Sequence, residues 1–193
     1  ELIEGPQIHE YEPTLGPDIH LLATMKNHGF IRDPGGYVGA LARAFEQGGG
    51  TILQAEVKDF DLSGGAISGV ETTQGRVACD DIVLATGVWS KPLMAKLGLN
   101  VPLESERGYH VIFEGATGGP ARPVMIASGK FVATPMAQGL RCAGILEFGG
   151  LDAAPSKAPL ALLRRQAKAA FPQLSATREI EWLGHRPAPS DSL

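Results

Sequence analysis

The chain has 193 residues, of which 44% are hydrophobic, and it carries a net charge of −4 with a mean hydropathy near zero. These values are typical of a soluble globular protein with a sizeable core, built as one large domain or two small ones. Because lysines and arginines form no cluster, we expect neither nucleic acid nor an anionic lipid surface as a partner.

The ends and the cysteines exclude further classes. No apolar run is long enough to cross a membrane, and the first residues lack a signal-peptide pattern, so we expect no transmembrane segment and a cytoplasmic location. Cys79 and Cys142 lie far apart without metal-ligand spacing, which argues against a disulfide framework and a metal site. The start without Met and the ending in Ser-Asp-Ser-Leu suggest a piece of a longer protein.

The first third of the chain predicts a connection, a helix and a meander. Residues 1–30 contain scattered prolines and no periodicity, so we expect an irregular surface segment. Asp33 and Pro34 predict a helix start, with Asp33 as the cap, and the helix over residues 37–47 carries an apolar stripe of Tyr37, Leu41 and Phe45. Strands separated by glycine turns are predicted at residues 51–53, 57–62, 67–72 and 76–79, as in a small antiparallel meander.

Residues 81–90, Asp-Ile-Val-Leu-Ala-Thr-Gly-Val-Trp-Ser, are the most informative segment. A continuous Ile/Val/Leu run predicts a strand buried on both faces, and the small residues Ala85, Thr86 and Gly87 would let the backbone approach a bound dinucleotide. An ordinary buried strand followed by a glycine turn would give the same pattern, so this segment alone does not decide between the two.

From residue 91 onward the pattern is mostly sheet. In the strand predicted over residues 107–113, alternation puts Tyr109, Val111 and Phe113 on one face and His110 and Ile112 on the other. Further strands are predicted at 124–127, 131–134, 140–146 and 180–182, with helices over 92–97 and 159–171. We therefore predict an α+β fold with two domains, residues 1–90 with a helix, a meander and a buried strand, and residues 91–193 with a mainly antiparallel sheet and the helix over 159–171.

Several pieces of the chain, in this order, resemble the FAD-dependent oxidoreductases of the D-amino-acid oxidase and dehydrogenase (DAO) family, which also includes glycine oxidase and sarcosine oxidase. The D-amino-acid dehydrogenase branch looks most similar, chiefly through residues 107–111 and 134–148. The resemblance implies that residues 1–90 are part of an FAD-binding α/β domain and that the rest forms a substrate domain. The matching segments are residues 33–34, 48–52, 69–75, 82–90, 107–110, 134–136, 147–148 and 182–187.

Part of the family pattern is missing from this sequence. Such proteins open with a strand, a Gly-x-Gly-x-x-Gly turn and a helix whose N-terminus holds the FAD pyrophosphate, and no such turn occurs here. The family's glycine-rich C-terminal segment near the flavin is missing as well. We therefore expect the chain by itself to be inactive.

The resemblance also implies the site residues. Arg186, in the Arg-Pro context, would bind the substrate carboxylate, because a planar guanidinium offers two parallel donors to a planar acceptor. Tyr109 would place its hydroxyl near the substrate or the flavin, although such a residue is more often part of a core. Contacts with FAD are implied for Val57, Ala85, Thr86, Gly87 and Trp89.

No catalytic side chain is assigned. His110 and His185 could in principle act as acid or base, but in this family hydride moves from the substrate carbon to flavin without an obligatory protein base. Glu147 and Met136 would lie on the substrate sheet with no role that distinguishes them from other sheet residues.

The implied reaction is the oxidation of a D-amino acid to an imino acid, which water hydrolyses to a 2-oxo acid and ammonia. An alternative keeps FAD but takes glycine or sarcosine, with oxygen as the acceptor. A third interpretation is that the isolated chain acts as a non-catalytic binding module. In the first two cases the partner is a small-molecule amino acid or amine, and the sequence leaves the electron acceptor open.

Overall fold

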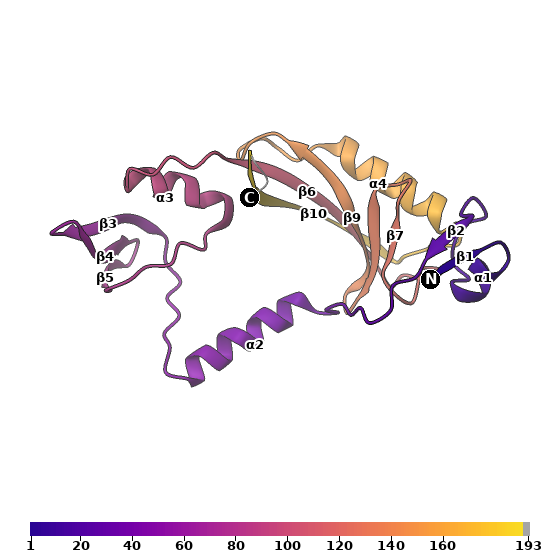
Figure 1. Ribbon diagram of the computed structural model, residues 1–193, viewed down its shortest axis with the longest axis horizontal. Helices are drawn as coiled ribbons and strands as arrows, with labels where there is room; N and C mark the ends of the chain where they lie inside the picture. The colour runs from indigo at the N-terminus through magenta and orange to yellow at the C-terminus, as the bar shows by residue number, and fades with distance from the viewer. Residues whose placement is uncertain (191–193) are drawn as a thin grey trace. The chain divides into compact units, whose positions relative to one another are not determined.

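The computed structural model describes residues 1–190 and has an α+β fold with antiparallel sheets, as the sequence predicts (Figure 1). It divides into two compact units, which are Glu1–Gly39 with Arg107–Gly184, and Ala40–Glu106 with the chain from His185 onward. This division differs from the predicted boundary at residue 90, because the first 39 residues belong with the sheet of the second half. The domain boundary of a complete enzyme stays a prediction.

A five-stranded sheet with the order β10-β6-β9-β8-β7 forms the main structural element. Antiparallel pairing joins β7 to β8 and β8 to β9, with Ala133 opposite Cys142 and Thr134 opposite Arg141. None of the described helices is long and apolar enough to span a bilayer. The strands are β6 (Leu103–Glu114), β7 (Val124–Ile126), β8 (Phe131–Met136), β9 (Gly139–Phe148) and β10 (Arg178–Pro189).

Helix α4 (Lys157–Ala170) packs on one face of this sheet and closes the core of the first unit. Its buried residues, which include Leu160 and Leu163, belong to the same hydrophobic core as Tyr109, Val111 and Phe113 of β6, and this confirms the predicted face of these three residues. These three side chains are at most 2% exposed. The alternate side chains of β6 and the apolar stripe of α4 are therefore buried in the same core.

The N-terminal segment is more ordered than the sequence suggests. It forms β1 (Leu2–Glu4), α1 (Gln7–Tyr11) and β2 (Leu21–Ala23), and β1 pairs with β2. Ile8 and Leu15 are buried in the same core as α4. The prediction of an irregular surface connection is therefore wrong, because two well-placed apolar side chains are enough to anchor short elements that lack periodicity.

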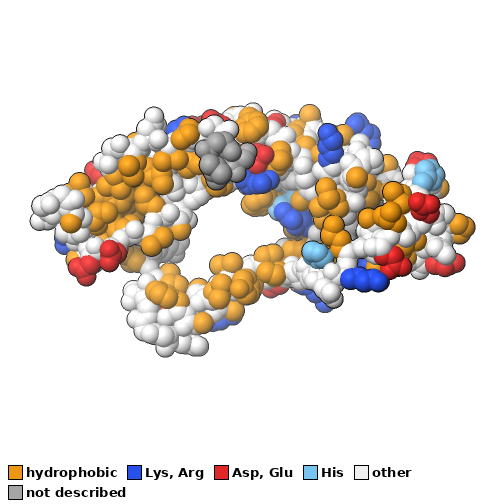
Figure 2. All heavy atoms as spheres, in the orientation of Figure 1, with side chains coloured by type: hydrophobic (Ala, Val, Ile, Leu, Met, Phe, Trp, Pro, Cys, Tyr) orange, Lys and Arg blue, Asp and Glu red, His pale blue; other side chains and the backbone are white. Residues whose placement is uncertain are grey.

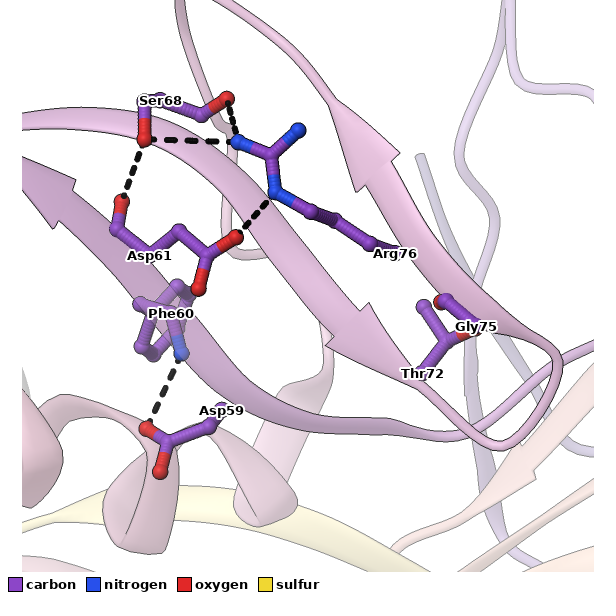
Figure 3. A network of polar contacts seen from close by, with 7 residues as sticks. All are labelled: Asp59, Phe60, Asp61, Ser68, Thr72, Gly75 and Arg76. Atoms are coloured by element: carbon purple, nitrogen blue, oxygen red, sulfur yellow. Dashed lines mark hydrogen bonds and ion pairs between the residues drawn. The ribbon is translucent and has the colours of Figure 1, made fainter.

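The predicted meander is confirmed in the second unit as β3 (Val57–Ser63), β4 (Ala66–Thr72) and β5 (Gly75–Ala78). Arg76 on β5 reaches across β4, donating to the backbone carbonyl of Ser68 at 3.0 Å and pairing with the carboxylate of Asp61 on β3 (Figure 3). One guanidinium thereby links all three strands. The strand predicted at residues 51–53 is absent, and Ile52 and Leu53 are about half exposed.

The buried strand predicted at the start of residues 81–90 is also absent. Residues 81–86 have no regular structure, and Val83 is 89% exposed. A parallel strand is held by neighbouring strands on both sides, and the described residues provide no such neighbour for this segment. The segment leads into a short 3-10 turn, η1 (Gly87–Trp89), and into α3 (Ser90–Lys96), the helix predicted at 92–97.

Helix α2 (Pro34–Gln47) forms where the sequence predicts a helix, and the backbone N–H of Gly36 donates to Asp33 Oδ1 at 2.9 Å, which confirms the cap. Its apolar stripe is not buried. Tyr37, Leu41 and Phe45 are between 53% and 57% exposed, and hydrophobic side chains gather along this helix in Figure 2. No described side chain of α2 is buried, so the helix forms on local signals without the core that its pattern anticipates.

Candidate functional site

The turn at residues 85–89 lies against the end of β10 in the second unit. The ring of Trp89 meets the imidazole of His185 edge to face, with 5.8 Å between centroids. His185 is held in turn by Ser105, whose Oγ lies 2.8 Å from its Nδ1. Because Arg186 follows His185 directly, the structure brings a predicted FAD contact next to the strand that carries the predicted substrate arginine.

The turn at residues 85–89 is held in place by buried residues and exposes its small residues to solvent. Val88 and Ser90 are buried, and the hydroxyl of Ser90 lies 2.8 Å from that of Thr86. Ala85, Thr86 and Gly87 are exposed, and Gly87 has a φ of +59°, a conformation that favours glycine. A fixed turn with small, exposed residues fits the close approach of a dinucleotide to the backbone.

Arg186 is 64% exposed, and its Nη1 lies 3.3 Å from Oε2 of Glu106 on β6. Exposed ion pairs of this kind contribute about 0–1 kcal/mol to stability. The guanidinium can therefore exchange Glu106 for another carboxylate at little cost. Binding of a substrate carboxylate by Arg186 stays a prediction, and the geometry leaves its donors accessible.

Tyr109 has different surroundings. Its side chain is 2% exposed, and its hydroxyl donates to Glu147 Oε1 and accepts from the backbone N–H of Ser156 at 2.9 Å. Direct contact with a substrate would require breaking this pair of bonds. The structure gives Tyr109 a structural role, and its predicted contact with substrate stays a prediction.

Arg107 is the residue that the sequence analysis missed. It is 2% exposed and donates through Nη2 to the carbonyl of Ala154 at 2.8 Å, while its Nη1 lies 3.5 Å from Glu147. Hydrogen bonding from Tyr109, aided by the positive charge of Arg107, holds the pKa of Glu147 below its ordinary value. A buried arginine must have such a partner, but the sequence alone does not say which carboxylate supplies it.

The remaining predicted residues are placed as follows. Val57 begins β3, is partly buried and pairs with Thr72, and nothing in the described part of the chain brings it to the turn at residues 85–89. His110 stacks on Trp182 with 4.6 Å between ring centroids. Burial, aided by the nearby charge of Arg141, lowers the pKa of His110 to about 4, so this imidazole is neutral at neutral pH.

Comparison with known protein families shows which family this chain belongs to. The sequence profile of the FAD dependent oxidoreductase (DAO) family matches residues 1–193. The chain belongs to this family. The DAO family uses FAD, which agrees with the resemblance drawn from the sequence.

Three curated relatives match the chain at moderate identity. A D-amino-acid oxidase of Bradyrhizobium diazoefficiens is 37% identical over 195 residues, which is 99% of this chain and 46% of that protein. A glycine oxidase of Pseudomonas putida is 31% identical over 72% of the chain and 38% of its own length. A D-amino acid dehydrogenase of Rhizobium rhizogenes is 29% identical over 78% of the chain and 36% of its own length. The chain thus spans less than half the length of these relatives.

Solved structures support the fold. The L-proline dehydrogenase of P. horikoshii superposes with a TM-score of 0.83 at 22% identity, covering 100% of this chain and 54% of that one. A glycine oxidase from Bacillus cereus gives a TM-score of 0.80 at 20% identity, with the same coverage. The described α+β architecture therefore corresponds to about half of a DAO-family structure.

Proposed function

We propose that this chain supplies the substrate sheet and one flavin-facing turn of an FAD-dependent enzyme that oxidises a D-amino acid. In the proposed reaction, loss of a hydride from the α-carbon and of a proton from the amino group would give an imino acid, which water would hydrolyse to a 2-oxo acid and ammonia. The observation that carries the proposal is the exposed turn at residues 85–87, held beside the strand that presents Arg186. The flavin, when bound, accepts the two electrons of the hydride.

The residues of the chain would bind and orient the substrate. Arg186 would exchange Glu106 for the substrate carboxylate and so fix the position of the α-carbon. The backbone at Thr86 and Gly87 would lie against the cofactor, with the half-exposed ring of Trp89 beside it. Val57 would lie near the adenine, as the family resemblance implies.

The electron acceptor separates two branches of the family. The sequence motifs favour the dehydrogenase branch, whereas the relative that is 37% identical over nearly the whole chain is an oxidase. We propose a D-amino acid as the substrate for both branches. Formation of hydrogen peroxide in air would assign oxygen as the acceptor, and its absence during turnover with an artificial acceptor would assign the dehydrogenase.

Two alternative functions can be tested with the full-length enzyme and with the isolated chain. The match to glycine oxidase favours glycine or sarcosine as a second substrate class, which substrate profiling separates from D-amino acids. For the isolated chain, the missing Gly-x-Gly-x-x-Gly turn favours a module that binds FAD weakly or not at all. Fluorescence titration of the chain with FAD checks this, and tight binding would contradict it.

The principal test replaces Arg186 in the full-length enzyme that contains this chain. We expect Arg186→Leu to raise the KM for the amino acid about tenfold or more, because a charge-assisted carboxylate contact is lost. Arg178→Leu is the matched control, since Arg178 also lies on β10, is 66% exposed and pairs with a glutamate at 2.9 Å.

Each result bears on one part of the proposal. An unchanged KM in Arg186→Leu would remove this residue from the site. A full-length enzyme that shows no flavin absorbance, and no bleaching with any D-amino acid, glycine or sarcosine, would refute the proposed function itself.

A further inference from the structure

Glu106 is the ion-pair partner of Arg186, the predicted substrate arginine, and both residues belong to the same compact unit. Ser105 on β6 contacts His185 on β10, so alternation along these two strands puts the next residues, Glu106 and Arg186, together on the opposite face. There Oε2 of Glu106 lies 3.3 Å from Nη1 of Arg186. A ligand carboxylate bound by this guanidinium would therefore lie close to a negative charge of the protein.

The two partners of this ion pair differ in exposure. The side chain of Arg186 is 64% exposed, whereas that of Glu106 is 21% exposed. Among residues 1–190, no other cationic side chain lies within 4 Å of Glu106. When Arg186 binds a substrate carboxylate, the arginine keeps an anionic partner, but Glu106 loses its cation and is left as a largely desolvated, unpaired charge. The exchange therefore favours a ligand that gives Glu106 a new cation.

An amino acid is a ligand of this kind. Its α-ammonium is attached to the carbon next to the carboxylate, so its two charges can reach a cation and an anion that lie 3.3 Å apart. A carboxylic acid without an amino group would leave Glu106 unpaired and would bring a second negative charge beside it, which is electrostatically unfavourable. The 2-oxo acid product of the proposed reaction is such an acid.

We propose that Glu106 determines substrate specificity by accepting hydrogen bonds from the α-ammonium of the amino acid while Arg186 holds its carboxylate. The ligand class is an α-amino acid in its zwitterionic form. Acids that carry hydrogen, a hydroxyl or an oxo group in place of the ammonium are disfavoured. In this arrangement, which rests on the proposed function for the role of Arg186, Glu106 also separates the substrate from the product, because deamination removes the cation that Glu106 binds.

The kinetic test compares D-alanine with propionate, its analogue without the amino group, in the full-length enzyme that contains this chain. The measured quantities are the KM for D-alanine and the Ki for propionate as a competitive inhibitor. Glu106→Gln frees Arg186 from its partner, and this gain applies equally to both ligands, so it cancels in the ratio of Ki to KM. Because the variant loses the charged contact with the ammonium and no longer repels propionate, this ratio should fall about tenfold or more.

Two further variants and a second ligand accompany this measurement. Glu106→Asp keeps the negative charge and should retain part of the preference for D-alanine. Glu114→Gln is the matched control, because Glu114 also lies on β6 and pairs with an arginine at 2.9 Å, and it should leave the ratio unchanged. Pyruvate, the 2-oxo acid that corresponds to D-alanine, should behave like propionate.

An equal ratio of Ki to KM in wild type and Glu106→Gln would overturn the inference, even if both constants change. A residue that only positions Arg186 affects the two ligands equally, because both bind through their carboxylate. If the enzyme oxidises D-alanine and the ratio is unchanged, the proposed function stands and the role of Glu106 is refuted.

A binding measurement covers the case in which the proposed function itself fails. If the full-length enzyme oxidises no amino acid, equilibrium dialysis gives the dissociation constants of D-alanine and propionate, which take the place of KM and Ki. A preference for D-alanine that Glu106→Gln abolishes would then support the zwitterion site and refute the proposed reaction. If wild type binds the two ligands equally, or binds neither, the site is refuted.

Discussion

Replacing Tyr109 with Phe tests whether this residue serves the fold or the substrate. The change removes the hydroxyl oxygen from a side chain that is 2% exposed, and it keeps the aromatic ring in the core, so no ring-sized cavity forms. Glu147 loses a donor, and the backbone N–H of Ser156, at the start of α4, loses its acceptor. A hydrogen bond to a charged group contributes about 1.5–3 kcal/mol and a neutral one about 0.5–1.5 kcal/mol, so we expect Tyr109→Phe to cost about 2–4.5 kcal/mol.

Urea unfolding of the chain, followed by far-UV circular dichroism, measures this cost. Tyr37→Phe is the control, because Tyr37 is 53% exposed, and a surface change of this kind should stay within about 0.5 kcal/mol. A loss as small as the control's would refute the reasoning. A raised KM in the full-length enzyme, with stability unchanged, would restore Tyr109 as a substrate residue.

Two further predictions concern His110 and Trp182, which stack on the face of the five-stranded sheet that points away from α4. Because the pKa of His110 is about 4 in the folded chain and 6.5 ordinarily, the unfolded chain binds a proton in this window and the folded chain does not, so stability should fall as the pH falls from about 7 to about 4. The loss attributable to His110 is about 3 kcal/mol at most, and it should be missing in His110→Gln; an NMR titration that finds the ordinary pKa would contradict it. In Gly184→Ala, the new methyl group would occupy the space of the Trp182 ring, so the stack on His110 should open, with a red shift of Trp182 fluorescence and a rise in the pKa of His110. Gly29→Ala, where an added Cβ meets nothing within 4 Å, should change neither property.

Local signals and periodicity were sufficient for most of the fold. The glycine-separated strands of the meander, the cap at Asp33 and the alternation along β6 all depend on neighbours within a few residues. The exposed segment around Val83 shows the limit of the same reasoning. Its apolar run predicts that the segment forms a buried strand. A strand also needs a partner strand, which is supplied by residues far away in the sequence, and Val83 is exposed because the described residues supply none.

The sequence predicted candidate site residues from their residue types, but it did not predict which residues contact each other in the fold. The ring of Trp89 lies beside that of His185, the residue before Arg186, which agrees with a shared site. The partners of Arg107 could not be predicted, because Ala154 and Glu147 are about 40 or more positions away and only the folded sheet brings them together.

Each face of the five-stranded sheet keeps one buried side-chain nitrogen without a hydrogen-bond partner among the described residues. Toward α4, Tyr109 and Arg107 bond to Glu147 and to backbone groups of the segment that leads into the helix, while Nε of Arg107 has no partner. On the opposite face, the atom without a partner is Nδ1 of His110, whose ring stacks on Trp182. A buried polar group without a partner costs free energy, so the missing partners alone do not distinguish one face of the sheet as the place for a ligand.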